Sequence, residues 1–84
     1  MYTLFIKRSA ERDLRRLPNA IFRRVNDKIL ALRDDPRPPG VYRLTGDLEG
    51  WRIRVGDYRV IYQVDDEAQT VTIVRVKHRR EVYR

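Results

Sequence analysis

One stretch constrains the fold more than any other: "WRIRVGDYRVIYQV", which runs from Trp51 to Val64. Apolar residues alternate with polar or basic ones on both sides of a central Gly-Asp pair, and such a pair is typical of a two-residue hairpin turn. Successive side chains of a strand lie on opposite faces of the sheet. The stretch therefore predicts two antiparallel strands, 51–55 and 58–64, with one apolar face and one face rich in arginine.

A two-residue turn also determines which residues of this hairpin lie opposite each other. The expected pairs are Val55 with Tyr58, Arg54 with Arg59, Ile53 with Val60, and Arg52 with Ile61. The expected apolar face consists of Trp51, Ile53, Val55, Tyr58, Val60, Tyr62 and Val64. The other face carries Arg52, Arg54 and Arg59, and no acidic residue of the two strands faces them.

The arginine face has two interpretations. Like charges directly opposite each other destabilise a sheet by tenths of a kcal/mol to about 1 kcal/mol, which a fold tolerates. The face is therefore either a solvated surface, with long side chains covering Ile61, or an electropositive patch that binds phosphate.

The rest of the chain predicts one further strand before the hairpin, two helices, and one strand after it. The chain is expected to begin with a strand over 2–7 and a helix with Ser9 as its N-cap, followed by a break at Pro18 and an amphipathic helix that ends near Asp34. A loop over 34–40, extended chain over 41–44 and the turn "TGDLEG" then lead to the hairpin. A strand over 71–77 and a polar tail of about one helical turn complete the chain. The second helix has the clearest signal, because Ile21, Val25, Ile29 and Leu32 recur at helical spacing.

This order, β-α-α-β-β-β, predicts an α+β domain. A two-helix hairpin would pack on one face of a small, mostly antiparallel, four-stranded sheet. The first strand is expected beside the last one. With 84 residues the chain is expected to form a single domain, 1–84.

The amino-acid composition indicates the charge of the partner that this chain would bind. The chain carries 19 Lys and Arg against 12 Asp and Glu, a net charge of +7, and 16 of the 19 basic residues are arginines. Arginine presents a planar fork of donors that suits phosphate and carboxylate, although a GC-rich coding sequence would also favour it. The charge balance points to an anionic partner such as nucleic acid.

Other classes of function find little support in the composition. There is no cysteine and only one histidine, which argues against a disulfide scaffold and a zinc site, and no metal or cofactor is expected. The first residues, "MYTLFIKRSAERDL", lack a continuous apolar segment, and no window approaches the roughly 20 apolar residues of a membrane span. We therefore expect a cytoplasmic protein without a membrane partner.

The tail brings further polar groups toward the hairpin. If Val64 pairs with Val71, then Arg59 lies near Val76, and the tail emerges beside the arginine face. His78, Arg79, Arg80 and Tyr83 follow in the tail. A histidine in a polar tail is usually solvated, and a terminal tyrosine often only anchors the tail against the sheet. By themselves these residues therefore do not indicate a functional site.

Taken together, these parts resemble the RelE/ParE superfamily of bacterial toxins, and most closely its RelE-like, mRNA-cleaving branch. The resemblance covers nearly the whole chain and is carried by "RLTG", "WRIRVGDYRVIY" and "HRREVY" in this order and spacing. It implies a type II toxin that cuts mRNA in the ribosomal A site, the decoding site. The ribose 2′-OH would attack the adjacent phosphate, giving a 2′,3′-cyclic phosphate and a free 5′-OH.

The resemblance also implies a catalytic set. The positions that match the family pattern are Arg52, Arg54, Arg59, His78, Arg79 and Tyr83. The chain departs from the pattern at Arg52 and Arg54, where RelE-type members carry lysine. Arginine keeps its proton at ordinary pH, so it can stabilise charge on phosphate but is a poor general base. That role would shift to His78, whose ordinary pKa is about 6.5, or to Tyr83.

Two other functions share the fold and remain open. ParE members inhibit DNA gyrase by binding and do not cleave RNA, although they typically lack the clustered arginines and terminal tyrosine. An inert binding module, or a toxin that has lost activity, is a third possibility. For either toxin class the resemblance implies a cognate antitoxin, and the basic composition predicts that its segment is acidic and amphipathic.

Overall fold

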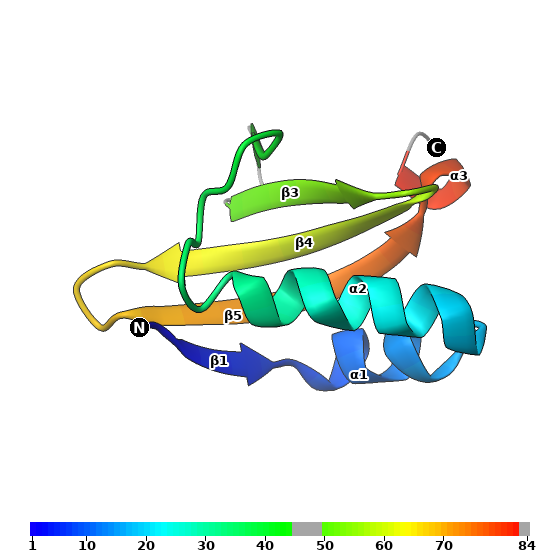
Figure 1. Cartoon of the computed structure of the whole chain (residues 1–84), viewed down its shortest axis with the longest axis horizontal. Helices are drawn as coiled ribbons and strands as arrows, with labels where there is room; N and C mark the ends of the chain where they lie inside the picture. Colours follow the sequence, from blue (N-terminus) through cyan, green and yellow to red (C-terminus); the bar gives the residue numbers. More distant parts are fainter. Residues whose placement is uncertain (45–49, 83–84) are drawn as a thin grey trace.

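The computed structural model describes residues 1–44 and 50–82, with the backbone alone at 81 and 82 (Figure 1). Its elements are β1 (Thr3–Ile6), α1 (Arg8–Arg15), α2 (Asn19–Ala31), β2 (Tyr42–Leu44), β3 (Gly50–Val55), β4 (Tyr58–Asp65), β5 (Thr70–His78) and α3 (Arg79–Val82). Most of the predicted turn "TGDLEG" lies outside the described residues. None of the described helices is both long and apolar enough to cross a membrane.

The five strands form one sheet in the order β1-β5-β4-β3-β2. β1 runs parallel to β5, and the other neighbours are antiparallel. α1 and α2 lie together against the sheet (Figure 1). The predicted α+β class and the docking of the first strand beside the last are therefore confirmed.

The sheet has five strands rather than the four predicted. The additional strand, β2, is only three residues long and pairs with β3 at the edge of the sheet. Three residues are too few for alternation to signal a strand, and its existence depends on pairing with a segment about eight residues further along the chain.

Two helix boundaries also differ from the prediction. Lys7 occupies the N-cap of α1, and Ser9 lies inside the helix, where its Oγ donates to the carbonyl of Val74 on β5 at 2.8 Å. α2 ends at Ala31 rather than near Asp34. The tighter i→i+3 hydrogen bonds that follow carry the turn on to Asp34, where the helical pattern of the sequence also ended.

The core lies between the helices and the apolar face of the sheet. Its buried residues are Ala10, Leu14, Val25, Ile29, Leu32, Ile53, Val55, Val60, Tyr62, Val71, Ile73 and Val76. Tyr62 is the largest fully buried side chain, and its hydroxyl donates to the carbonyl of Pro36 at 2.8 Å. Burial raises the pKa of Tyr62 to about 12, so the phenol stays protonated and keeps this bond.

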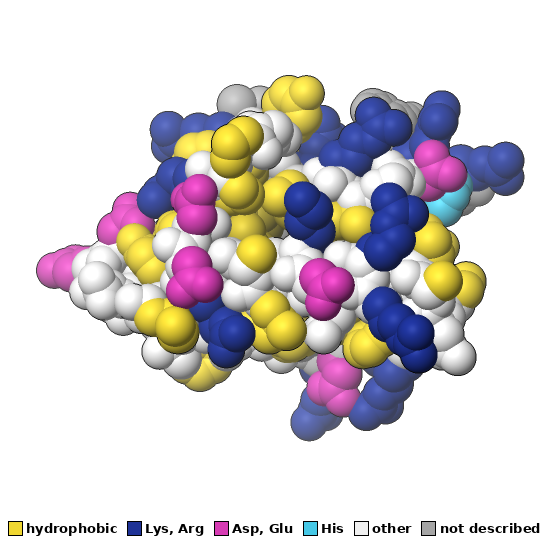
Figure 2. All heavy atoms as spheres, in the orientation of Figure 1, with side chains coloured by type: hydrophobic (Ala, Val, Ile, Leu, Met, Phe, Trp, Pro, Cys, Tyr) yellow, Lys and Arg dark blue, Asp and Glu magenta, His cyan; other side chains and the backbone are white. Residues whose placement is uncertain are grey.

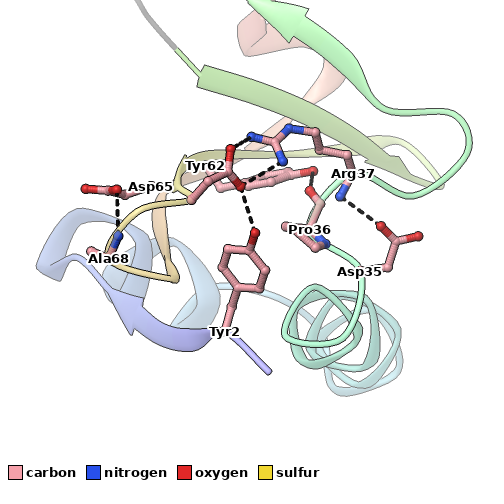
Figure 3. A network of polar contacts seen from close by, with 8 residues as sticks. Tyr2, Asp35, Pro36, Arg37, Tyr62, Asp65 and Ala68 are labelled. Carbon is pink, nitrogen blue, oxygen red and sulfur yellow. Dashed lines mark hydrogen bonds and ion pairs between the residues drawn. The ribbon is translucent and has the colours of Figure 1, made fainter.

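A polar network closes the end of the sheet where β4 turns into β5 (Figure 3). Arg37 of the proline-rich loop donates two hydrogen bonds to the Asp66 carboxylate, at 3.0 and 2.8 Å, and the Tyr2 hydroxyl donates a third at 2.7 Å. The hydrogen bonds from Arg37 and then from Tyr2 hold the pKa of Asp66 below its ordinary value. Three segments that are distant in sequence are thus tied together at this end.

α1 covers the part of β5 that extends beyond β1. β1 pairs only as far as Ile73, so the next residues of β5 would form an open edge. Asp13 of α1 fills this gap: its Oδ2 accepts the Val76 N–H at 2.9 Å and Arg75 Nε at 2.8 Å. Burial acts to raise the pKa of Asp13, but these hydrogen bonds outweigh it, so the pKa lies below its ordinary value.

Replacement of this carboxylate should destabilise the fold in a pH-dependent way. Asp13→Asn is expected to lower the free energy of unfolding by roughly 1–3 kcal/mol at pH 7, because it weakens hydrogen bonds to a charged group. The pKa is lowered in the folded state, so the carboxylate's contribution is present above its ordinary pKa of 3.8 and is lost as the pH falls through the folded value.

Urea unfolding at neutral pH and at about pH 2 measures this effect, since the difference between wild type and variant should shrink at the lower pH. Asp27→Asn on the exposed side of α2 is the matched control. A difference that stays constant with pH would show that the Asp13 charge does not hold the edge of β5.

Candidate functional site

The β3–β4 hairpin has the predicted register. Its pairs include Val55 with Tyr58, Arg54 with Arg59, Ile53 with Val60, and Arg52 with Ile61. Gly56, the first turn residue, has a φ of 60°, a conformation that glycine adopts without a steric penalty. The turn thus brings Arg54 and Arg59 opposite each other, one step before the chain reverses.

These two guanidinium groups converge on one backbone carbonyl. Arg54 Nε donates to the Gly56 oxygen at 3.0 Å, and Arg59 Nη1 approaches the same oxygen at 3.4 Å and the Tyr58 oxygen at 3.1 Å. Arg59 is only 8% exposed, and it is the buried charged residue of the described chain. Its contacts are with neutral carbonyls, so its positive charge remains uncompensated by a carboxylate among the described residues.

Arg52 lies on the same face but turns away from this pair. Its guanidinium lies 5.8 Å from the centre of the Tyr42 ring on β2, within the range of a cation–π contact. Its Nε is buried without a hydrogen-bond partner among the described residues. Arg52 is thus two strand positions from Arg54 along the face and is oriented by the edge strand.

The pairing of β4 with β5 places the residues before the tail. Val64 pairs with Val71, as expected, but a bulge leaves Val74 unpaired, so Arg59 lies opposite Lys77 rather than Val76. One residue further, His78 pairs with Tyr58, and their rings meet edge to face at 5.2 Å. Side chains alternate along β4, so His78 belongs to the face of Tyr58, while Lys77 joins Arg54 and Arg59.

His78 has a defined hydrogen bond. Its Nδ1 accepts the backbone N–H of Arg80 at 3.3 Å. A neutral imidazole that accepts at Nδ1 carries its proton on Nε2, which is therefore a donor. In this arrangement His78 can donate a hydrogen bond from Nε2, and it can take a proton only if Nδ1 gives up its contact with the tail.

Arg79 is tied to the hairpin turn. Its backbone N–H donates to the Asp57 carbonyl at 2.7 Å, and its Nη1 lies 3.9 Å from the Asp57 carboxylate. α3 begins at this residue and packs against β4 and β5. Arg79 therefore lies beside the turn that positions Arg54 and Arg59. Tyr83, the last residue of the predicted set, lies outside the described residues.

Two further cations lie at this end of the sheet that the sequence did not single out. Lys77 is brought opposite Arg59 by the bulge. Arg24 of α2 reaches the turn from the helix side: a β-carbon on Gly56 would lie 3.5 Å from its Nη2. Strand alternation could not predict the position of Lys77, because the bulge shifts the register of β5. The position of Arg24 depends on how α2 crosses the sheet.

Charge is unevenly distributed over the molecule. In Figure 2, Lys and Arg side chains gather around the histidine, beside one acidic side chain. At the opposite end of β4, the turn into β5 contains three consecutive acidic residues: Asp65, Asp66 and Glu67. The hairpin-turn end, which we call the arginine end (Arg24, Arg54, Arg59, Lys77 and Arg79), is therefore the better site for a polyanion.

An open groove of about 900 Å³ lies away from the arginine end. Its lining includes Arg37, Arg43, Trp51, Gln63 and Asp66. The charge of Arg37 is neutralised by Asp66, and the guanidinium groups of Arg37 and Arg43 lie against the Trp51 ring at 5.2 and 5.9 Å. The charged groups of this groove largely contact one another or the Trp51 ring, so we assign the function to the arginine end. Among the described residues, no three potential metal-ligating side chains of His, Asp or Glu cluster together.

The comparison with protein families places this small α+β fold in a class of bacterial toxins. The family description that matches residues 4–83 is "ParE toxin of type II toxin-antitoxin system", and the chain belongs to this family, within the RelE/ParE superfamily.

Several of the individual proteins to which the chain is similar are RelE-type toxins. The chain is 41% identical to toxin RelG of Mycobacterium tuberculosis, over 99% of this chain and 97% of that protein. Among solved structures, it is similar to the toxin–antitoxin complex RelBE2 of M. tuberculosis, with 37% identity, 92% and 96% coverage of the two chains, and a TM-score of 0.81. It is also similar to an archaeal RelE–RelB complex from Pyrococcus horikoshii, with 36% identity, 93% and 94% coverage, and a TM-score of 0.82.

Proposed function

We propose that this toxin is a ribosome-dependent endoribonuclease that cuts mRNA in the ribosomal A site and so inhibits translation and growth. The main supporting observation is Arg59, a nearly buried cation that faces Arg54 and whose hydrogen-bond partners among the described residues are carbonyls. Such a pair is unfavourable on its own and becomes favourable when a phosphate lies between the guanidinium groups. The similarity to RelE-type toxins supports RNA as the source of that phosphate.

In this scheme the arginines stabilise charge and other groups move protons. The 2′-oxygen of the substrate attacks the adjacent phosphorus and loses its proton to a base, while the bond from phosphorus to the 5′-oxygen breaks and that oxygen gains a proton. Arg54 and Arg59 neutralise the negative charge that develops on the pentavalent phosphate. Arg79, held at Asp57, assists the leaving 5′-oxygen. Arg52, oriented toward Tyr42, binds the neighbouring part of the backbone.

His78 and Tyr83 are the proposed proton-handling residues. With Nδ1 bonded to the N–H of Arg80, neutral His78 presents an N–H donor at Nε2 that can hydrogen-bond to the leaving oxygen. Transfer of a proton to that oxygen would require the imidazolium form, which gives up the contact with Arg80 and returns to neutral imidazole after the transfer. Tyr83, as a phenolate, would then take the proton of the 2′-OH and become the neutral phenol. Because neither role uses a strong base, much of the rate enhancement would come from positioning of the mRNA by the ribosome.

The proposed partners follow from the same chemistry. The ribosome and its bound mRNA are the polyanionic targets, which implies a cytoplasmic location. We also propose a cognate antitoxin, since solved relatives are complexes with RelB. With a net charge of +7 on the toxin, an acidic amphipathic segment is the form of antitoxin that would neutralise the arginine end.

Mapping of 5′ ends in cellular transcripts after induction tests the proposal. Cuts at fixed codon positions within translated regions are expected. The matched ParE description keeps gyrase inhibition as the alternative, and DNA damage with intact mRNA would favour that alternative and contradict ours.

Variants of the two proton-handling residues should separate their roles. His78→Gln and Tyr83→Phe are each expected to slow cleavage on programmed ribosomes by about 10²-fold or more, a typical contribution of one general acid or base. Ribosome binding should change little, because neither substitution removes a permanent charge. Full activity in both variants would exclude these residues from proton transfer.

A further inference from the structure

Arg24 on α2 is a cation whose position is explained neither by the fold nor by the catalytic set. It is exposed and lies on the helix side of the sheet, while Arg54 and Arg59 lie on the opposite side. Its guanidinium nevertheless lies close to the hairpin turn, since a β-carbon on Gly56 would lie 3.5 and 3.6 Å from its two terminal nitrogens. A β-carbon at position 56 would be in ordinary van der Waals contact with the guanidinium, so glycine is favoured there by the turn conformation rather than by lack of space.

This position places three guanidinium groups around one peptide unit. Arg54 and Arg59 approach the carbonyl oxygen of Gly56, and Arg24 lies within 4 Å of the position that a β-carbon of Gly56 would occupy. Asp27 follows Arg24 by three residues on the same helix, a spacing that permits an ion pair. No such pair forms, and none of the ion pairs between described residues involves Arg24. Folding thus places Arg24 near two other arginines, without an ion-paired carboxylate among the described residues.

We propose that Arg24 binds a backbone phosphate of the mRNA adjacent to the scissile one. This inference rests on the proposed function and extends the binding surface from the sheet, around the Gly56 turn, onto α2. Successive phosphates of a single strand are a few ångströms apart, so a strand that places one phosphate between Arg54 and Arg59 can place the next against Arg24. Arg24 is accordingly a substrate-binding residue that acts in the ground state and the transition state alike.

Such a role predicts a distinctive kinetic pattern. Arg24→Ala should raise KM several-fold and leave kcat within about twofold, because uniform binding is lost. Each phosphate contact contributes about one to the slope of log K against log salt, so the slope should become shallower by about one. Arg24→Lys should restore the slope, because it retains the charge.

The experiment measures binding of the full-length toxin to ribosomes programmed with a short mRNA that carries 2′-deoxynucleotides in the A-site codon, which cannot be cleaved. Affinity is followed from about 50 to 200 mM salt. Arg23→Ala is the matched control, since Arg23 is exposed on the same helix but points about 100° away from Arg24. It should keep the wild-type slope. An unchanged slope in Arg24→Ala, or an equal change in both variants, overturns the proposal.

A second arm identifies the source of the phosphate. With an mRNA that ends at the P-site codon, the difference between wild type and Arg24→Ala should disappear. A difference that persists would assign the phosphate to ribosomal RNA and overturn the mRNA contact. Cleavage of unmodified mRNA by the wild type tests the proposed function separately. If the mRNA is cleaved but binding does not depend on Arg24, only the role of Arg24 is refuted. If binding depends on Arg24 but the mRNA is not cleaved, only the proposed nuclease activity is refuted.

Discussion

Arg59→Ala is expected to lower kcat for mRNA cleavage on programmed ribosomes by about 10²- to 10³-fold, the usual loss when one preorganised donor to a transition-state oxyanion is removed. Arg59 is held by the carbonyls of Gly56 and Tyr58 before any substrate binds. It therefore needs no reorganisation when charge develops on the phosphate. KM should change much less than kcat, because the donor acts mainly in the transition state.

The same variant should remain folded. It loses two hydrogen bonds to carbonyls, but it also removes a nearly buried charge and its repulsion from Arg54 across the hairpin. These effects oppose each other, so the free energy of unfolding should change by no more than about 1 kcal/mol. Arg59→Lys, which keeps the charge and loses the planar fork, should have intermediate activity.

Controls at two other positions test the location of the site. Gln63 lies on the same strand and face as Arg59 but toward the other end of the sheet, so Gln63→Ala should retain wild-type activity. Arg79→Ala, at the arginine end, should abolish growth inhibition on expression. If the Arg59→Ala and Arg79→Ala variants both stay fully toxic, the arginine end is not the active site.

The hairpin could be predicted from sequence because its determinants are local. A two-residue turn at Gly56 and strict alternation on both sides leave one register that buries the apolar face, since a slip of one residue would expose it. The helices followed from periodicity, and β1 was expected beside the last strand, although its parallel direction was not predicted. These features predicted that Arg54 and Arg59 would meet.

The features that the sequence did not predict depend on contacts between distant segments. At the bulge, Ser9 of α1 donates to the Val74 carbonyl and Asp13 accepts the Val76 N–H. The bulge shifts the register so that Lys77, not Val76, faces Arg59. β2 is a strand only because β3 lies beside it. The orientation of Arg24 depends on how α2 crosses the sheet, and helical periodicity marks Arg24 only as solvent-facing.

Gly50→Ala is expected to cause the largest loss of stability in the described chain. Gly50 begins β3 with a φ of 146°, a conformation that residues with a side chain rarely adopt. A β-carbon there would lie 2.5 Å from the backbone oxygen of Tyr62, on the central strand β4. The clash is with backbone rather than with a flexible side chain, so β3 and β4 must separate locally or Gly50 must change its conformation.

Either response disturbs the pairing of Trp51 with Tyr62, whose side chain is completely buried. Backbone strain and the clash together should cost about 3 kcal/mol, which for a domain of this size lowers the melting temperature by roughly 15 °C. Gly40→Ala is the matched control, because Gly40 also has a positive φ, 87°, but a β-carbon there would meet nothing within 4 Å. It should lose only about 1 kcal/mol, the cost of the backbone conformation alone. Thermal unfolding of the two variants followed by circular dichroism measures the difference, and equal losses would show that close packing of Gly50 against β4 does not limit stability.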